Sequence, residues 1–410
     1  MRLSYCTIGL LGIVIGVGAS LNCGTPGAVL PFPKTVAWAQ WTVNRGANIR
    51  PAAVAVADFD GDGLLDIIAG YPGTDTVTAA VIIFFQTDVD NYTAVQLASH
   101  ADLTGLAALA VADLDADTHS DVVAACDGRL IYLHSPADPR QAADWTFSTI
   151  DQSTGDDIHQ WNDVAVGDID RLGSPDIVAC NADIGRLCWF QSPADPTSGT
   201  GWIRIDIDAT TRTNATSVVL GDIDGGAGWI DIYSTAPGET TGRVAWYQNP
   251  TDPVADAWSK TAIGNLANAT RLAAGDLNGD GQNDVVTINP VGRQVGWYAK
   301  PADPTTAWTG YLLTQYSTNV PTDVKVADID GNLQLDVVVA TEQAGSLRWF
   351  TPIGVQTLQW GENNLQDLNE DVGHIALADI DADGRPDVVA PLLAGTTDQD
   401  SIAWFENPEP

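Results

Sequence analysis

Short stretches of alternating hydrophobicity recur along the chain, and an acidic segment follows each of them. Residues 54–57 (Val-Ala-Val-Ala) precede Asp58, and Asp66 begins a run of β-branched residues. The same order appears near the C-terminal end, at 324–327 and 336–339. Alternating and β-branched stretches separated by turn residues are typical of strands joined by a loop. The pattern therefore predicts a repeated unit of strand, loop and strand.

The acidic segment has seven copies, whose first aspartates lie 51 to 55 residues apart. After each copy come a Gly-rich turn and a third strand, which in five repeats carries an aromatic pair such as Trp189-Phe190. A fourth strand is predicted near Trp145 and its counterparts. Four antiparallel strands repeated about every 50 residues predict the blades of a β-propeller. We call the seven acidic segments the aspartate loops: residues 58–66, 113–121, 168–176, 222–231, 276–284, 328–336 and 379–387.

The ends of the chain favour a closed ring over a solenoid, which is the competing repeat architecture. The seventh repeat ends at Asn407-Pro408, directly after its third strand, and so lacks a fourth. A spare strand is predicted at 38–43, before the first repeat. This strand can complete the last blade and remove an open sheet edge. We therefore predict an all-β, seven-bladed propeller over residues 36–410, closed by an N-terminal strand.

The aspartate loops follow the pattern Asp-x-[Asp/Asn]-x-[Asp/Asn]-x-x-x-Asp, which places oxygen donors at alternate positions. Ca²⁺ takes six to eight oxygen ligands, including backbone carbonyls. The seventh position would offer its carbonyl, and glycines such as Gly61 and Gly63 would allow the tight turn. An EF-hand is excluded, because position twelve is Ala69 rather than Glu in the first copy and the flanking segments are strands. A solvated, metal-free acidic turn is the alternative.

Five loops are complete, so we predict about five Ca²⁺ sites. The third loop has Leu172 where the ligand at position five belongs. The fourth has Gly226 there and an extra residue that should displace Asp231, so these two loops should be weak or empty. The predicted ligands are Asp58, Asp60, Asp62, Leu64, Asp66, Asp113, Asp115, Asp117, His119, Asp121, Asp276, Asn278, Asp280, Gln282, Asp284, Asp328, Asp330, Asn332, Gln334, Asp336, Asp379, Asp381, Asp383, Arg385 and Asp387.

The amino-acid composition restricts the classes of binding partner that the protein can have. The 410 residues carry 18 Lys and Arg against 53 acids, a formal net charge of −35. Phosphate contacts need clustered basic residues, so nucleic acid is excluded, as is an anionic membrane surface. Hydrophobic residues make up 45% of the chain, which is enough for a globular core. Only six acids are Glu, and this excess of Asp indicates turns and metal loops.

The N-terminus predicts export. Residues 1–22 combine Arg2 with an apolar stretch and a small-residue cleavage site, which is typical of a signal peptide. A membrane anchor and a lipoprotein modified at Cys23 are the alternatives. Residues 23–35 read as a linker, and no later apolar run is long enough to span a bilayer. We therefore expect a secreted or cell-surface protein without membrane insertion.

Two cysteines flank a predicted hairpin turn. Cys180 and Cys188 could form a cross-strand disulfide, which an exported protein permits. Two buried thiols are the alternative.

The unit from Val54 to Gly70 resembles the FG-GAP/VCBS repeat of integrin-α-like, calcium-binding propellers. The resemblance covers all seven repeats, roughly residues 36–410, and the Trp-Phe-x-Asn-Pro tail is similar to bacterial members and to fungal lectin-type propellers. It implies that calcium lies in the hairpin between the first two strands of a blade, held by the residues named above. It also implies binding of an extracellular ligand or glycan, or adhesion.

A second site is expected on the face away from the aspartate loops, near the central channel. Aromatic and polar residues on such a rim suit sugar stacking and hydrogen bonding, and the residues at these positions differ between repeats. Ordinary surface variation is the alternative. The loops before the first strands carry Arg50, His159, Trp161, Arg271 and His374, and those between second and third strands carry Tyr71, Asp127, Asn181, Glu239 and Glu342.

These observations predict a monomeric, calcium-binding propeller that binds carbohydrate or a surface protein. The alternatives are a polysaccharide-active lyase or hydrolase built on a propeller, and a purely structural surface protein. The five histidines share no repeat position, and no nucleophile or phosphate-loop motif is present. We therefore predict no catalytic residue.

Overall fold

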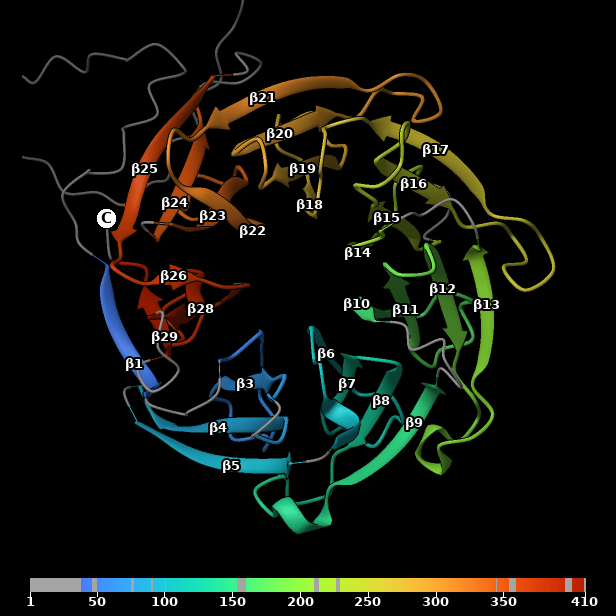
Figure 1. The fold of residues 1–410 in the computed structure, drawn as a ribbon, viewed down its shortest axis with the longest axis vertical. Coiled ribbons are helices and arrows are strands. Elements are labelled where there is room, and N and C mark those ends of the chain that lie inside the picture. Colours follow the sequence, from blue (N-terminus) through green and yellow to red (C-terminus); the bar gives the residue numbers. More distant parts are fainter. Residues whose placement is uncertain are drawn as a thin grey trace, which may run out of the picture.

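Seven antiparallel sheets surround a central channel, like the blades of a propeller (Figure 1). Six sheets have four strands, and in the seventh the innermost strand is split in two. The predicted all-β, seven-bladed fold is confirmed. The computed structural model describes residues 38–45, 50–74, 77–89, 91–99, 101–152, 160–209, 214–225, 229–343, 345–353, 359–394 and 400–408.

The first three blades follow the predicted order of strands, from the channel outwards. Blade one contains β2 (Ala53–Ala57), β3 (Asp66–Tyr71), β4 (Ala80–Asp88) and β5 (Asn91–Ser99). Blade two contains β6 (Ala108–Ala112), β7 (Asp121–Cys126), β8 (Arg129–His134) and β9 (Thr146–Gln152). Blade three contains β10 (Trp161–Gly167), β11 (Asp176–Asn181), β12 (Arg186–Gln191) and β13 (Ile203–Asp208).

The remaining blades repeat this plan. Blade four contains β14 (Ser217–Gly221), β15 (Asp231–Thr235), β16 (Val244–Gln248) and β17 (Ser259–Gly264). Blade five contains β18 (Arg271–Gly275), β19 (Asp284–Asn289), β20 (Gln294–Ala299) and β21 (Thr309–Gln315). Blade six contains β22 (Val320–Ala327), β23 (Asp336–Glu342), β24 (Ser346–Pro352) and β25 (Trp360–Asp367). Blade seven contains β26 (Asp371–Val372), β27 (Ala376–Ala378), β28 (Asp387–Leu393), β29 (Ser401–Glu406) and β1 (Ala39–Arg45).

The ring closes as predicted, because β1 is the outermost strand of blade seven. It pairs antiparallel with β29, and Trp41 lies opposite Trp404. The two indoles stack with their ring centroids 6.1 Å apart, and Trp41 Nε1 donates to Glu406 Oε2 at 3.0 Å. The pairing covers the edge of β29, which would otherwise expose unpaired backbone groups.

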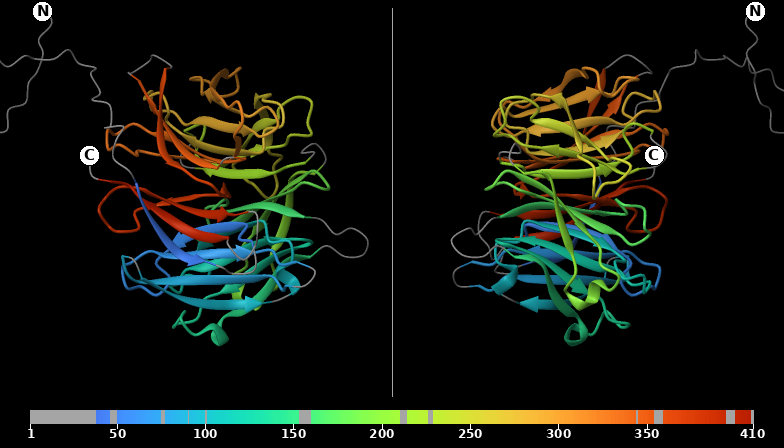
Figure 2. Two further views of the ribbon diagram at one scale, coloured as in Figure 1. Left: turned by 60° about the vertical axis from the view of Figure 1, so that its left-hand side comes forward. Right: turned by 90° about the vertical axis from the view of Figure 1, so that its right-hand side faces the viewer.

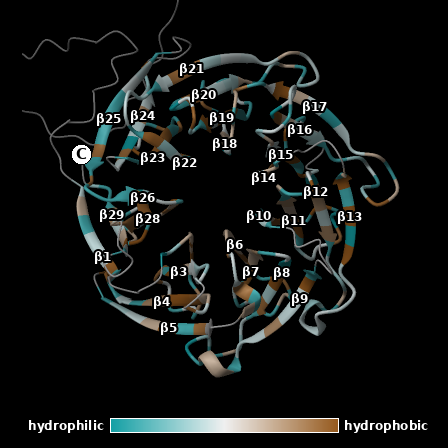
Figure 3. Cartoon of the chain, viewed as in Figure 1, coloured by the Kyte–Doolittle hydropathy of each residue, from teal (hydrophilic) through white to brown (hydrophobic). Residues whose placement is uncertain are grey.

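The core lies between neighbouring blades. Ile68 and Phe85 of blade one share a hydrophobic cluster with Val122 and Ile131 of blade two. Figure 3 shows how hydrophobic residues concentrate in the strands around the ring. The third-strand tryptophans belong to this core, since each is at most 1% exposed: Trp189, Trp246, Trp297, Trp349 and Trp404.

The disulfide considered between Cys180 and Cys188 is absent, and both residues are buried free thiols. The register explains why. Cys188 lies opposite Ala179, whereas Cys180 lies opposite Leu187. Neighbouring cross-strand pairs project to opposite faces of a sheet, and the two sulfurs accordingly lie in different core clusters.

Each aspartate loop connects the innermost strand of a blade to the second strand. Because all blades have the same orientation, these loops share one face of the ring, and the turns between second and third strands lie on the other (Figure 2). In the part of the chain that the structure describes, no helix is long and apolar enough to cross a membrane. The predicted signal peptide (1–22) and linker (23–35) lie outside the described residues.

Candidate metal loops and central channel

The first aspartate organises each aspartate loop. In the first loop, Asp58 Oδ1 accepts from the backbone N–H of Gly61 at 2.8 Å, and its Oδ2 accepts from Gly63 at 3.0 Å. Asp276 makes the same two contacts in the fifth loop. The chain can turn this tightly because positions four and six are left-handed, with φ of +72° at Gly61 and +89° at Gly63. The predicted role of these glycines is confirmed.

Other loops adopt the same backbone without glycine. Positions four and six of the second loop are Ala116 (φ +62°) and Thr118 (φ +77°), and Leu333 holds φ +66° in the sixth. A left-handed conformation costs a residue with a Cβ roughly 1–2 kcal/mol. The second and sixth loops therefore keep the same geometry although it costs conformational free energy at these residues.

Carboxylates converge within the loops. One oxygen from each of Asp58, Asp60 and Asp62 lies within 4.8 Å of the others. The second loop brings Asp113, Asp115 and Asp117 together in the same way. Like charges at this separation disfavour ionisation unless a cation compensates them.

The third and fourth loops, expected to be weak, also gather three carboxylates each. The groups are Asp168, Asp170 and Asp176, and Asp222, Asp224 and Asp231. Both include the last aspartate of the loop. In the third, Asp168 Oδ1 is buried without a hydrogen-bond partner in the described structure.

The extra residue in the fourth loop does not displace Asp231, and that expectation was wrong. Asp231 Oδ2 accepts from Ile223 N at 3.1 Å, and its Oδ1 accepts from Asn249 N at 2.7 Å. The insertion is accommodated before the last aspartate, because this residue is held by both contacts. Gly226 lies outside the described residues.

The last aspartate of each loop is buried, and in every blade except the sixth it ties two backbone segments together. Asp66 Oδ2 accepts from Phe59 N at 3.0 Å, and its Oδ1 accepts from Gln86 N at 2.8 Å, at the end of the third strand. Burial raises the pKa of Asp66 to about 7, against the opposing effect of the two N–H donors. Burial likewise raises the pKa of Asp284 and Asp387 to about 7.

Basic side chains reach some loops. Arg140, from blade two, donates through Nε to Asp60 Oδ2 of blade one at 2.6 Å. His134 Nδ1 lies 3.2 Å from Asp115 Oδ2 in the second loop. The Arg140 guanidinium offsets part of the carboxylate charge in the first loop.

The donor set fits a hard divalent cation. The converging atoms are carboxylate oxygens, and Oδ1 of Asp168, the first aspartate of the third loop, is buried without a hydrogen-bond partner in the described part of the chain. Calcium prefers such oxygens and tolerates irregular geometry. The aspartates at positions one, three, five and nine are the residues that would hold it.

A second group of polar residues lies in the central channel. In each blade, one residue lies five positions before the first aspartate of the loop. This residue lines the same cavity in all seven blades. Its occupants are Ala53, Ala108, Asp163, Ser217, Arg271, Asp323 and His374.

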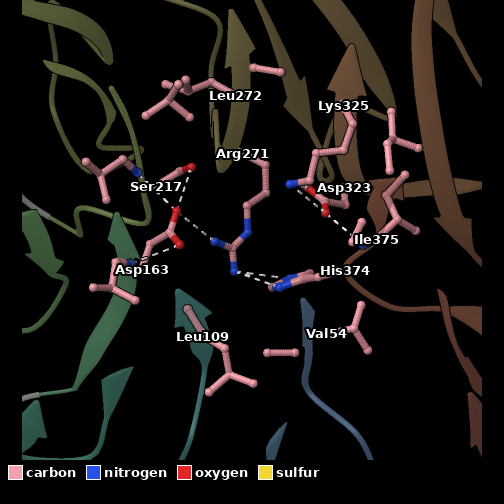
Figure 4. Close-up of a pocket in the computed structure, with 18 of the residues that line it drawn as sticks. Val54, Leu109, Asp163, Ser217, Arg271, Leu272, Asp323, Lys325, His374 and Ile375 are labelled. Carbon is pink, nitrogen blue, oxygen red and sulfur yellow. Dashed lines mark hydrogen bonds and ion pairs between the residues drawn. The ribbon is translucent and has the colours of Figure 1, made fainter. Parts of the chain in front are cut away.

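Arg271 connects this group across the channel (Figure 4). Its Nη1 lies 3.3 Å from Asp163 Oδ2, and its Nη2 lies 3.1 Å from His374 Nε2. Ser217 Oγ donates to Asp163 Oδ2 at 3.0 Å. Residues from blades three, four, five and seven therefore form one hydrogen-bonded network.

The predicted rim is confirmed only in part. Arg50 and Glu342 line the outer channel together with Arg271 and His374. Trp161 and Tyr71 do not form stacking platforms, since both are 1% exposed and belong to the core. His159 lies outside the described residues.

Three further rim candidates lie away from the described cavities. Asp127 joins the turn that precedes blade three through an isolated bridge to Gln160. Asn181 Oδ1 accepts from Asp183 N within its own turn. Glu239 pairs with Lys260 at 2.9 Å.

Sequence reasoning missed Asp163, Ser217, Asp323 and Lys325. They sit inside the first strands, which were interpreted only as alternating runs. For Asp163, Ser217 and Asp323, the available signal was a polar residue at the repeat position where the first two copies have Ala53 and Ala108. Lys325 lies two positions later, where those copies have Ala55 and Ala110.

Family models agree with the repeat assignment. An FG-GAP repeat matches residues 51–84, and an FG-GAP-like repeat matches residues 226–287, 276–339 and 328–390. No curated protein matches the chain.

Two solved structures share the fold. One is a chain in the crystal structure of BBS1N in complex with ARL6DN, soaked with lead, with a TM-score of 0.55 and 11% identity over 91% of this chain and 98% of that chain. The other is an Agrocybe aegerita lectin that recognises non-reducing terminal N-acetylglucosamine, with a TM-score of 0.55 and 12% identity over 88% of this chain and 86% of the lectin chain. With its seven repeats and these matches, the chain belongs to the FG-GAP repeat family.

Proposed function

We propose that this protein is a secreted, monomeric, calcium-stabilised propeller that binds an extracellular carbohydrate or surface protein. The observation that carries the proposal is the convergence of carboxylate oxygens within 4.8 Å in successive loops of one face. FG-GAP repeats are generally calcium-binding and typical of extracellular proteins. The fold shared with a lectin supports carbohydrate as one ligand class.

A bound calcium ion would offset two negative charges of its loop and reduce the repulsion between the carboxylates. In every blade except the sixth, the last aspartate also joins its loop to the end of the third strand. Calcium would therefore stabilise the ring, while the ligand is bound elsewhere.

Metal analysis and thermal unfolding test the calcium part. We expect several Ca²⁺ per purified chain and a Tm that falls on chelation. Asp58→Asn and Asp381→Asn should lower the Tm in calcium and have little effect in chelator. Asp256→Asn, an exposed aspartate outside the aspartate loops, is the control. Absence of Ca²⁺, or a Tm unchanged by chelator, would contradict this part.

A glycan array with and without Ca²⁺ tests the ligand part. Calcium-dependent binding without turnover supports a binding module. Release of products from a polysaccharide would instead identify an enzyme. No detectable binding to glycans or to surface proteins would indicate a structural role.

A further inference from the structure

We infer that the central channel holds a binding site for a neutral, hydroxyl-rich group, such as the terminal residue of a neutral glycan. The inference rests on the proposed carbohydrate binding and assigns it a place that is separate from the aspartate loops. Figure 4 shows the residues that form this site.

The first argument is the departure from repeat symmetry. Equivalent positions on the innermost strands of a propeller all face the same channel. Blades one and two have Ala53 and Ala108 there, whereas blades three to seven have five polar side chains. The fold places the same packing requirements on this position in each blade. These requirements therefore do not explain why blades three to seven are polar here and blades one and two are apolar.

The second argument is the cavity itself, which has a volume of ≈ 560 Å³. Binding sites for small molecules have volumes of about 300–1,000 Å³ and combine apolar walls with a few polar groups. Here Val54 and Leu109 form an apolar side opposite the Arg271 network (Figure 4). A wider outer cavity, lined by Asn162, Thr270 and Arg271 among others, leads to it from the face opposite the aspartate loops.

The third argument is the charge of the inner cavity. Its lining holds two carboxylates, Asp163 and Asp323, and two cations, Arg271 and Lys325. Lys325 Nζ lies 3.2 Å from Asp323 Oδ2, and Arg271 lies against Asp163. These charges cancel, so a charged ligand would enter without compensation, which is costly in a partly buried site.

His374 does not change this balance. Burial, reinforced by the nearby Arg271, lowers the pKa of His374 to about 3, so its imidazole is neutral. Although burial alone would raise the pKa of Asp323, the cations Lys325 and Arg271 and the backbone N–H of Ile375 hold it below its ordinary value. The cavity therefore presents a neutral set of groups around neutral pH.

The fourth argument is the type of groups on the wall. Carboxylates accept hydrogen bonds, guanidinium and ammonium donate them, and Ser217 does both. Hydroxyl groups of a ligand can satisfy all of these, while its C–H face covers Val54 and Leu109. No Phe, Tyr or Trp side chain lines either described cavity, so neither cavity offers a large aromatic platform for stacking a nucleobase.

The test measures binding of neutral methyl glycosides and of methyl glucuronide to the full, calcium-loaded protein by saturation-transfer NMR and titration calorimetry. We expect a neutral glycoside to bind and the anionic one to bind more weakly. Val54→Trp, which fills the apolar side, should weaken binding by about ten-fold or more. Val291→Trp, at a position 76% exposed on the β19–β20 turn, is the matched control and should bind normally.

Arg271→Gln provides a second route if Val54→Trp does not fold. Asp163 keeps Ser217 Oγ and Val218 N as donors in that variant, so the blades stay connected. Loss of binding with an unchanged Tm supports the site. Equal binding by wild type and both folded channel variants would overturn the channel site alone, as would tighter binding of the glucuronide. A wild type that binds no glycan would overturn the proposed carbohydrate binding as well.

Discussion

Asp336 ends the sixth aspartate loop, and its Oδ1 is buried without a hydrogen-bond partner in the described structure. Elsewhere this oxygen accepts from the residue that follows the aromatic pair by two, such as Ser192 or Asn407. In blade six that residue is Pro352, which has no N–H. Burial, together with the nearby carboxylate of Asp330, raises the pKa of Asp336 to about 8, compared with about 7 for Asp66, which has both backbone donors.

Restoring the donor should stabilise the protein. Pro352→Ser gives blade six the residue that blades two and three have, and Asp336 gains an N–H partner. We expect a gain of about 1 kcal/mol, since an unsatisfied buried acceptor costs more than the lost proline rigidity contributes. The reciprocal change Ser192→Pro removes the 2.7 Å bond to Asp176 and should destabilise. Urea unfolding in chelator measures both, and equal effects of the two changes would contradict the explanation.

At the scale of one element, each aspartate loop is a hairpin that joins a buried acid to exposed acids. Burial raises the folded-state pKa of Asp66, Asp284 and Asp387 to about 7, whereas the ordinary value is about 3.9. Between these values the folded chain binds more protons than the unfolded chain. Stability therefore decreases as pH rises through this window when no metal is bound.

We expect the calcium-free protein to lose urea resistance from about pH 4 to about pH 7, and saturating Ca²⁺ to remove this loss. A bound cation favours the ionised carboxylates, which cancels the proton difference. Asp66→Asn should flatten the calcium-free profile by one titrating group. Urea midpoints measured at several pH values check this, and a midpoint that rises with pH in the calcium-free protein would refute it.

The elements show where the period-two pattern is informative and where it is not. It predicted the strands on both sides of each loop, such as β2 and β3 around the first loop. It could not tell which face of a strand meets a neighbouring blade, so Trp161 was expected on the rim. The pattern also did not determine on which face of the sheet Cys180 and Cys188 lie. A register shift of one residue moves a side chain to the opposite face.

At the scale of the whole molecule, repeat counting predicted seven blades and the closing role of β1. The meeting of Asp163, Arg271 and His374 was not predictable in the same way. These residues are more than 100 positions apart, and they converge only because a closed ring directs equivalent positions to one axis. A repeat alignment shows that these three residues occupy equivalent positions, but it does not show whether their side chains are long enough to meet in the channel.

Removing the closing strand should weaken the entire ring. A variant that begins at residue 50 lacks β1, exposes the edge of β29 and leaves Trp404 without its stacking partner. We expect a Tm lower by several degrees and concentration-dependent association through the open edge. A variant that begins at residue 36 retains β1 and serves as the control. Equal melting and equal size in solution for the two variants would contradict the role of closure.

The pairing of β1 with β29 also determines when the molecule can be finished. The indole of Trp41 bonds to Glu406, 365 positions later in the chain. During synthesis from the N-terminus, β1 therefore waits without its partner until β29 (Ser401–Glu406) has been added. Blade seven cannot form before that point, so the ring closes only after the strands of the other six blades have been synthesised.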